Sequence, residues 1–385
     1  MSGAIAIKAA TIFDGDNWHD ESALVLRDGV VEAIVGAAHV PSGNEVVSVD
    51  GMLVPGFVDL QVNGGGGIML NDRQDVEAIR TICAAHAPFG TTALLPTLIT
   101  DTAKITRAAI EAGAEARRRN VPGFLGLHLE GPHLSIARKG AHDPALIRPM
   151  DDEAEAALIA AHETMPVLLT TVAPESVEPA RIARLVEAGI VVSLGHSDTS
   201  YPRAIACAES GASMATHLFN AMSQITNREP GLAGAAIDSG QFFAGIIADG
   251  IHVDPATIRI AHKAKSAPGK LFLVTDAMAT LGTDMTSFTL NGRTITRANG
   301  RLTLDDGTLA GADLDMISAV RFMHRTIGVD LSEALRMASL YPAQAMGIEG
   351  SHGRFARGAR GDVVHLSDKL DVRAVWIGGR RVFSA

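Results

Sequence analysis

The feature that most constrains this chain is a series of short apolar runs that alternate with stretches of helical periodicity. Eight such runs occupy the middle of the sequence, at residues 55–61, 92–97, 123–130, 166–172, 190–196, 213–217, 242–249 and 270–276. Near-continuous apolar runs of this length are typical of strands buried on both faces of a parallel sheet. Between most of them apolar residues recur at helical spacing, at residues 101–119, 152–162, 177–188, 201–211 and 255–266. This alternation predicts an α/β fold of the (β/α)8, TIM-like barrel type, with a doubly wound open sheet as the alternative.

Both ends of the chain have a different pattern, in which short β-like segments are separated by turns. We expect these ends, residues 1–53 and 348–385, to pair into one small β-sandwich domain, and residues 54–347 to form the barrel. The sequence also predicts a final helix over residues 331–346. An inserted hairpin is expected over residues 287–304, because Asn291-Gly292 is a strong signal for a two-residue hairpin turn.

Composition excludes several classes of protein. Apolar residues make up 47% of the chain and charged residues 20%, so a disordered chain is excluded. The net charge of −10 argues against binding to nucleic acid or to an anionic membrane surface. The two cysteines, Cys83 and Cys207, form no CxxC pair, and no apolar run reaches 18 residues. Without a recognisable signal peptide, these features lead us to expect a cytoplasmic protein that acts on a small molecule.

Polar side chains close four of the predicted strands. Glu130, His196, His217 and Asp276 each stand at the end of a run. In a (β/α)8 barrel the carboxyl ends of the strands meet at one rim, where active sites are built. A Glu and two His form a mixed O/N ligand set that suits Zn²⁺ or another borderline divalent ion with one position open for water. Asp276 is then the natural base beside that water.

Each of these residues also has an ordinary interpretation. A Glu after a strand is usually a solvated loop carboxylate, and a lone His is more often a hydrogen-bonded core or surface residue. The occurrence of all four at corresponding strand ends favours the metal site over these readings. The other histidines, among them His19, His39, His86, His262 and His324, lack this placement and are interpreted as structural or surface residues.

Nine segments in order along the chain carry a family resemblance. They lie at residues 55–64, 128–133, 139–142, 194–197, 216–222, 228–234, 247–252, 274–277 and 307–311. With these motifs the chain resembles the amidohydrolase superfamily and, within it, the family of N-acetylglucosamine-6-phosphate deacetylases. The resemblance covers nearly the whole chain and includes the β-domain divided between the two ends.

The resemblance implies a role for individual residues. Glu130, His196 and His217 match the metal ligands of the family, and Asp276 matches its catalytic acid/base. The remaining matched positions contact the substrate. His142 and His252 match residues that contact the sugar and its acetamido group. Asn220, Ala221 and Arg228 match residues that contact the phosphate, and Ala141, Leu309 and Ala310 match residues that line the sugar pocket.

One position departs from the wider superfamily. Many amidohydrolases carry His-x-His at the end of the first barrel strand, where this chain has Gln61-Val-Asn63. Neutral amides are poor ligands for a second transition metal, so we expect one divalent metal per subunit. Zn²⁺ is the first choice, while Fe²⁺, Co²⁺ and Mn²⁺ suit the same ligands. Gln61 and Asn63 would hydrogen-bond a water in the second site, or simply cap the loop.

The resemblance implies hydrolysis of N-acetyl-D-glucosamine 6-phosphate to D-glucosamine 6-phosphate and acetate by metal-activated water, with Asp276 as general base and acid. A deacetylase of the galactosamine epimer, an amidohydrolase with another amide substrate, and a non-catalytic binding protein are the alternatives. The last is disfavoured because all four candidate chemical residues are present. The resemblance also implies a homodimer, because the family's phosphate-binding arginine region lies near its dimer interface.

Overall fold

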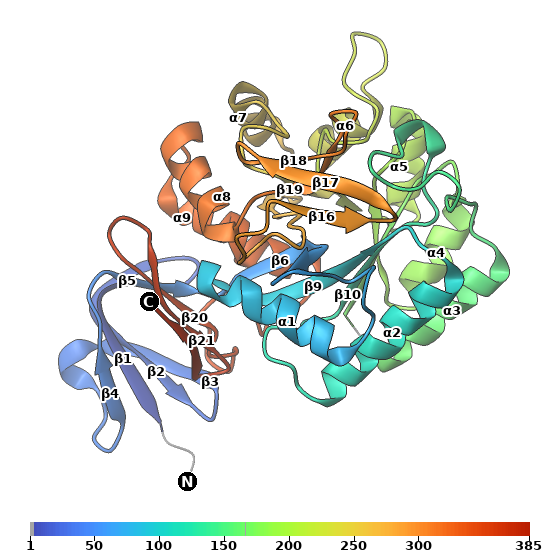
Figure 1. The fold of residues 1–385 in the computed structure, drawn as a ribbon. Helices are drawn as coiled ribbons and strands as arrows, with labels where there is room; N and C mark the ends of the chain where they lie inside the picture. The colour runs from blue at the N-terminus through green and yellow to red at the C-terminus, as the bar shows by residue number, and fades with distance from the viewer. Residues whose placement is uncertain (1–3, 166) are drawn as a thin grey trace. The chain divides into compact units, whose positions relative to one another are not determined.

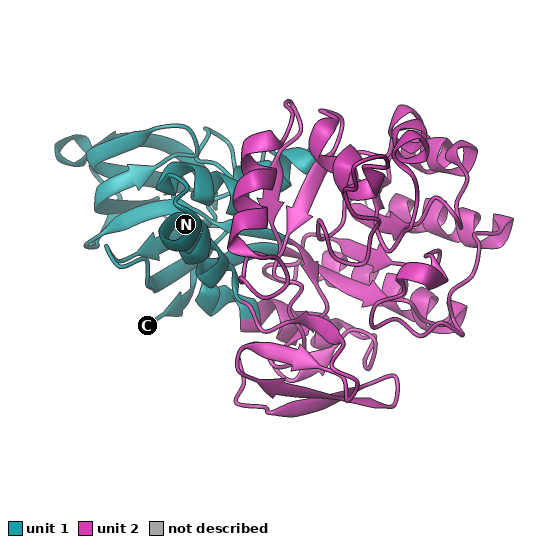
Figure 2. Cartoon of the chain, turned by 90° about the horizontal axis from the view of Figure 1, so that it is seen from above, with its two compact units in different colours: residues 1–59, 86–93, 315–385 teal, residues 60–85, 94–314 magenta. Residues whose placement is uncertain are grey.

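The computed structural model describes residues 4–165 and 167–385. The chain divides into two compact units, one of residues 1–59, 86–93 and 315–385 and the other of residues 60–85 and 94–314, which Figure 2 colours separately. Residues 1–3 of the predicted β-domain and Pro166, the first residue of the predicted strand 166–172, lie outside the described residues.

A parallel sheet matches the eight predicted runs. In the described part of the chain its strands follow the order β15-β14-β13-β12-β11-β10-β9-β6. Their bounds are β6 Phe57–Val62, β9 Thr91–Ile99, β10 Leu127–Glu130, β11 Leu168–Val172, β12 Val191–Leu194, β13 Met214–Ala215, β14 Phe243–Ile246 and β15 Leu271–Leu273. A parallel bridge pairs Val62 with Ala277, and the Asp276 amide donates to the Gln61 carbonyl over 3.0 Å. The sheet is therefore nearly closed, which confirms the barrel and excludes the open sheet.

Helices follow the strands along the chain and contact one another in sequence from α2 to α7. Their bounds are α1 Val76–His86, α2 Ala103–Arg118, α3 Asp152–Thr164, α4 Pro179–Glu187, α5 Tyr201–Glu209, α6 Gly231–Asp238 and α7 Pro255–Ala264. Figure 1 shows α2, α3, α4 and α5 around the outside of the strands. Four of these helices, among the described residues, follow a residue whose side chain accepts a hydrogen bond from the first turn, namely Asp75, Thr102, Asp151 and Asp254.

Strands from both chain ends form a second sheet, as predicted. They are β1 Ile5–Phe13, β2 Trp18–Arg27, β3 Val30–Gly36, β4 Glu45–Ser48, β5 Met52–Pro55, β20 Val363–Leu366, β21 Val372–Ile377 and β22 Arg380–Ser384. Antiparallel pairing of β5 with β20 joins the N-terminal strands to the C-terminal ones. Buried side chains from both groups, such as Ile12, Leu53 and Trp376, share one hydrophobic cluster, so the two ends stabilise each other.

The predicted hairpin is part of a larger insertion. Strands β16 Ser287–Leu290 and β17 Arg293–Ala298 are joined by Asn291 and Gly292, whose φ values of 49° and 73° are those of the expected turn type. Two further strands, β18 Arg301–Thr303 and β19 Leu309–Ala312, complete a four-stranded antiparallel sheet among the described residues. This inserted sheet contributes one wall of the site described below.

The final helix differs from the prediction. After α8 Met316–Phe322 and a π-helix at Met323–Ile327, the sequence pattern over residues 331–346 forms two helices, α9 Leu331–Ala338 and α10 Leu340–Ala345. The interruption at Ser339 arises because Pro342 has no N–H to donate to the carbonyl four residues earlier. At the end of α9 the Ser339 amide donates to the Arg336 carbonyl, and the Ser339 hydroxyl donates to the Leu335 carbonyl over 2.7 Å.

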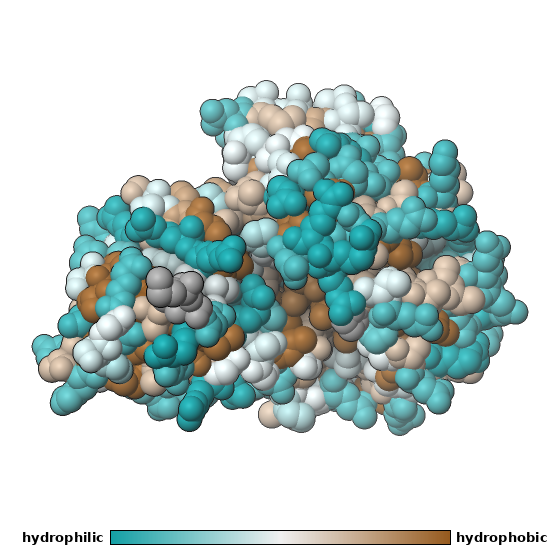
Figure 3. All heavy atoms as spheres, turned by 90° about the horizontal axis from the view of Figure 1, so that it is seen from below, coloured by the Kyte–Doolittle hydropathy of each residue, from teal (hydrophilic) through white to brown (hydrophobic). Residues whose placement is uncertain are grey.

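Hydrophilic side chains cover much of the face in Figure 3, and hydrophobic ones are scattered among them in small groups. None of the helices within residues 4–165 and 167–385 combines the length and the apolar character that crossing a bilayer requires.

Candidate active site

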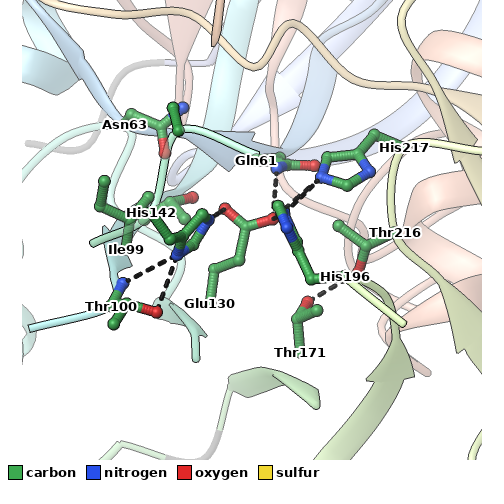
Figure 4. A network of polar contacts seen from close by, with 12 residues as sticks. Gln61, Asn63, Ile99, Thr100, Glu130, His142, Thr171, His196, Thr216 and His217 are labelled. Carbon is green, nitrogen blue, oxygen red and sulfur yellow. Dashed lines mark hydrogen bonds and ion pairs between the residues drawn. The ribbon is translucent and has the colours of Figure 1, made fainter. Parts of the chain in front are cut away.

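One carboxylate and two imidazoles converge at the carboxyl ends of the barrel strands. Glu130 is the last residue of β10, and its Oε1 lies 3.2 Å from Nε2 of His196 and 3.1 Å from Nε2 of His217. The two histidine Nε2 atoms are 3.0 Å apart, and all three side chains are buried (Figure 4). The prediction that these strand ends meet is therefore confirmed as geometry.

The hydrogen bonds of His196 leave one of its ring nitrogens available as a metal ligand. Nδ1 of His196 lies 2.9 Å from the Arg138 carbonyl, which can only accept, so Nδ1 carries the proton and Nε2 is free to coordinate. Donor atoms that each lie about 2.0 Å from one tetrahedral ion are roughly 3.3 Å from each other, close to the separations found here. A buried group of one carboxylate oxygen and two imidazole nitrogens at this spacing fits a divalent metal ion.

The electrostatics agree with a cation at this place. Burial alone would raise the pKa of Glu130, but hydrogen bonds to His196 and His217 hold it well below its usual range. Burial would likewise lower the pKa of His217, but the bond to Glu130 and its charge raise that pKa above the ordinary value. In the absence of a metal the cluster thus attracts a proton, because the converging lone pairs favour a positive charge.

His142 adjoins the cluster from the loop after β10. One ring nitrogen lies within 4.8 Å of ligand atoms of Glu130 and His196, so it could also serve as a ligand. The contacts of Nδ1 point to another role: the Thr100 amide donates to Nδ1 over 3.4 Å, and the Thr100 hydroxyl lies 2.7 Å away. With Nδ1 accepting, Nε2 carries the proton of the neutral ring. Burial and nearby His196 lower the pKa of His142 well below its ordinary value, so the ring stays neutral and acts as a donor.

Asp276 follows β15 and has the properties of a base. Burial and the charge of Glu130 raise its pKa to about 6, well above the ordinary value of an aspartate. Asn63 opposes that rise by donating from Nδ2 to Oδ1 of Asp276 over 2.6 Å. Gln61 contacts the other carboxylate, donating from Nε2 to Oε1 of Glu130 over 3.1 Å. Both amides therefore contact site carboxylates, and neither is confined to capping the loop.

A cavity of about 420 Å³ lies against the carboxylates of Glu130 and Asp276 and the imidazoles beside them. The predicted site residues that line it are Asn63, Glu130, Ala141, His142, His196, His217, Asn220, Ala221, His252, Asp276 and Leu309. His252 is oriented by Asp249, whose carboxylate lies 2.6 Å from Nδ1, which leaves Nε2 free. The inserted sheet adds further lining through Leu290, Gly307, Thr308 and Gly311.

Three predicted contact residues do not line this cavity. Gln61 is buried and contacts Glu130 but is not among the lining residues. Ala310 is fully buried in the hydrophobic cluster beside the inserted sheet, and Arg228 lies exposed on the loop between β13 and α6. The structure thus brings Asn220 and Ala221 to the cavity without Arg228. The prediction that all three contact one phosphate remains a prediction.

Two residues near the site escaped the sequence reasoning. Thr100 follows directly after β9 and holds His142, and a polar residue at the end of an apolar run was a usable signal for it. Arg293 on β17 donates to the carbonyl of Ala141. No local sequence signal indicates which loop the inserted sheet contacts, so Arg293 could not have been found in this way.

A nearly closed parallel barrel whose strand ends converge on a carboxylate and imidazoles is an architecture of metal-dependent hydrolases. The chain belongs to the amidohydrolase family, whose model matches residues 52–382. As a member of that family it is a hydrolytic enzyme, and the family-level resemblance found in the sequence is confirmed.

Named relatives cover nearly the whole chain. An N-acetylgalactosamine-6-phosphate deacetylase of a Shewanella strain is 41% identical over 98% of this chain and 95% of its own. The crystal structure of N-acetylglucosamine-6-phosphate deacetylase from Pasteurella multocida is similar with a TM-score of 0.94, at 35% identity over 99% of this chain and 100% of that one. A variant N-acetyl-D-glucosamine-6-phosphate deacetylase from Mycobacterium smegmatis was solved in complex with N-acetyl-D-glucosamine-6-phosphate. Its structure is similar with a TM-score of 0.91, at 32% identity over 99% of this chain and 100% of that one.

Proposed function

We propose that this protein hydrolyses N-acetyl-D-glucosamine 6-phosphate to D-glucosamine 6-phosphate and acetate. The observation that carries the proposal is the convergence of Glu130, His196 and His217 in one buried cavity that Asp276 also lines. Names of relatives with both epimeric substrates support an amino-sugar phosphate as the substrate class. The galactosamine epimer is the second candidate, because the relative at 41% identity carries that name.

In this proposal Glu130, His196 and His217 hold one divalent ion, with Zn²⁺ as the first choice and Fe²⁺, Co²⁺ or Mn²⁺ as alternatives. When bound, such an ion lowers the pKa of a water and polarises a carbonyl. Glu130 supplies the negative charge, and the Arg138 carbonyl fixes the tautomer of His196. Asn63 and Gln61 orient the carboxylates of Asp276 and Glu130. In this proposal their amides also hydrogen-bond a water in the second site.

Asp276 moves the proton. Its carboxylate accepts a proton from the attacking water and delivers it to the leaving amine nitrogen. A pKa of about 6 suits both steps, because the carboxylate is mostly ionised near neutral pH yet still holds a proton readily. The Nε2–H group of His142 is available to donate to the oxygen of the acetyl group as charge develops there. His252 donates from Nδ1 to Asp249, so Nε2 of its neutral ring accepts a hydrogen bond from the substrate instead.

The remaining roles concern substrate binding. The turn at Asn220 and Ala221, with Arg228, binds the phosphate, since a guanidinium donates charge-assisted hydrogen bonds to phosphate oxygens. Ala141, Leu309 and Ala310 shape the sugar pocket. Because Arg228 is exposed, its part in the site fits a homodimer in which the loop adjoins a neighbouring subunit. We also propose that the protein is cytoplasmic, and that residues 54–347 form the barrel domain and residues 1–53 and 348–385 the β-domain.

Acetate release tests this proposal. Purified protein of known metal content would be incubated separately with the two epimeric N-acetylhexosamine 6-phosphates. We expect faster release from the gluco epimer, loss of release on chelation, and about one metal per subunit. Preference for the galacto epimer would select the second candidate, and release from neither would reject both. His196→Ala should lose the metal, and unchanged metal content would refute the ligand set.

A further inference from the structure

A buried polar layer lies beside the Glu130, His196 and His217 cluster inside the barrel. The Thr216 hydroxyl is 2.7 Å from that of Thr171 and 2.6 Å from that of Ser193, and Thr171 Oγ1 is 2.7 Å from Nε2 of His128. Figure 4 shows the bond between Thr171 and Thr216. Branched apolar side chains usually fill the interior of such barrels, and burying hydroxyls is costly unless they are paired. Here each hydroxyl has a partner.

Thr216 is the shared member of this layer and directly precedes His217. The φ of His217 is +30°, in the left-handed region that residues other than glycine rarely adopt. Such a conformation persists only where the surroundings hold it. The hydrogen bonds of Thr216 to Thr171 and Ser193 fix the residue immediately before His217 and so help to maintain this conformation.

The ring of His217 depends on its backbone more than the ring of His196 does. Nδ1 of His196 donates to the Arg138 carbonyl, whereas Nδ1 of His217 is buried without a hydrogen-bond partner in the described part of the chain. A histidine whose second nitrogen makes no bond is oriented by the position of its backbone and by packing. Displacement of Thr216 would therefore change the direction of His217 Nε2.

The same layer also packs against the turn that carries His196. A Cβ built on Gly195 would lie 2.8 Å from Cβ of Thr216 and 2.9 Å from Cγ2 of Thr171, too close for any side chain. The backbone before His196 thus rests directly on the two threonines. One small group of side chains supports the turns of both histidines.

We propose that Thr216 is a positioning residue for the metal site: its hydroxyl, fixed by Thr171 and Ser193, holds the turns that direct His217 and His196 toward one ion. This inference rests on the proposed function, in which the two histidines bind a divalent metal. It adds to the metal ligands a residue that binds no metal itself but is required for their orientation.

Zinc affinity of purified protein, measured by competition with a chelator of known affinity, tests the inference without relying on turnover. Thr216→Val keeps the branched shape and removes the hydroxyl, and we expect about 10–100-fold weaker zinc binding. Thr216→Ser keeps the hydroxyl and should restore most of the affinity. Thr170→Val is the matched control, because Thr170 is equally buried and its hydroxyl donates only to the Leu129 carbonyl.

We expect zinc affinity in Thr170→Val within about twofold of wild type, even where thermal unfolding shows a similar loss of stability. Wild-type zinc affinity in Thr216→Val, or an equal loss in Thr170→Val, would overturn the inference while leaving the proposed function intact. Absence of zinc binding in the wild-type protein would overturn both. If Thr216→Val does not fold, Ser193→Ala removes one of the two bonds, and an unchanged zinc affinity in that variant would also overturn the inference.

Discussion

Asn63 donates a hydrogen bond from Nδ2 to Oδ1 of Asp276 over 2.6 Å, and both side chains are buried. The two residues come from opposite ends of the barrel sequence and meet where the sheet closes, beside the bridge between Val62 and Ala277. A hydrogen bond to the ionised form of a carboxyl lowers its pKa, whereas burial and the charge of Glu130 raise the pKa of Asp276 to about 6. Asn63 therefore limits how far the pKa of the proposed base can rise.

Asn63→Leu should move the acid limb of the pH–rate profile to higher pH. Loss of the bond raises the pKa of Asp276, and a bond to a charged group is worth about 1.5–3 kcal/mol, which corresponds to a shift of roughly one unit or more. kcat/KM measured between pH 5 and 8 checks this. A bound cation lowers the pKa of Asp276 in the wild type and in the variant alike. The test is therefore the difference between the two acid limbs, and not the position of either one. Asn71→Leu is the control, because Asn71 donates to Asp101 instead; an unshifted limb in Asn63→Leu would contradict the argument.

Asp276→Asn should stabilise the metal-free protein while abolishing most turnover. The folded-state pKa of about 6 lies above the ordinary 3.8, so ionisation of Asp276 opposes folding. The cost is absent below about pH 4, grows as pH rises to 6 and is then constant, at about 1–3 kcal/mol. Urea unfolding of the metal-free variant should show a gain over wild type at pH 8 and little gain at pH 4. A difference independent of pH would show that Asp276 is not the titrating group.

Gly195→Ala should weaken metal binding without removing any ligand. The added methyl group would lie 2.8 Å from Thr216 and 2.9 Å from Thr171, so the turn before His196 must move. Metal content after dialysis against a weak chelator should fall well below that of wild type. Gly350→Ala is a control for loss of glycine, since nothing lies within 4 Å of a Cβ built there and, as at Gly195, φ lies outside the left-handed region. Full metal retention in Gly195→Ala would contradict the tight packing of this turn.

The site was predictable wherever a side chain ends a barrel strand. Glu130, His196, His217 and Asp276 could be grouped from sequence because apolar runs identify parallel strands, and the ends of parallel strands converge. His142 could be proposed only by resemblance. It lies in an irregular loop, and its anchor Thr100 is 42 positions earlier in the chain. No periodic pattern encodes a contact between a loop residue and a strand end.

Other features depend on contacts that local patterns do not contain. The Asn291-Gly292 turn could be predicted because both positions require positive φ, but the addition of β18 and β19 to the hairpin could not. The apolar spacing around Ser339 continues across the break between α9 and α10, so it predicts one helix. There the missing N–H of Pro342 outweighs the pattern.

Arg293 offers the last test, because it links the inserted sheet to the loop that carries His142. Its guanidinium donates to the Ala141 carbonyl, and Ala141 also packs against the hydrophobic cluster that includes Leu290. Ala141 and Leu290 both line the cavity, so this bond fixes two of its walls relative to each other.

Arg293→Met should therefore raise KM about tenfold and change kcat less, since Thr100 still holds His142 in place. Steady-state kinetics with N-acetyl-D-glucosamine 6-phosphate measure both parameters. Arg297→Met is the matched control on the same strand. Arg297 donates to the Thr283 carbonyl and to Asp313 and makes no bond to Ala141, so its loss weakens the sheet without releasing this loop. An equal rise of KM in both variants would mean that stability of the inserted sheet, and not the bond to Ala141, sets the shape of the cavity.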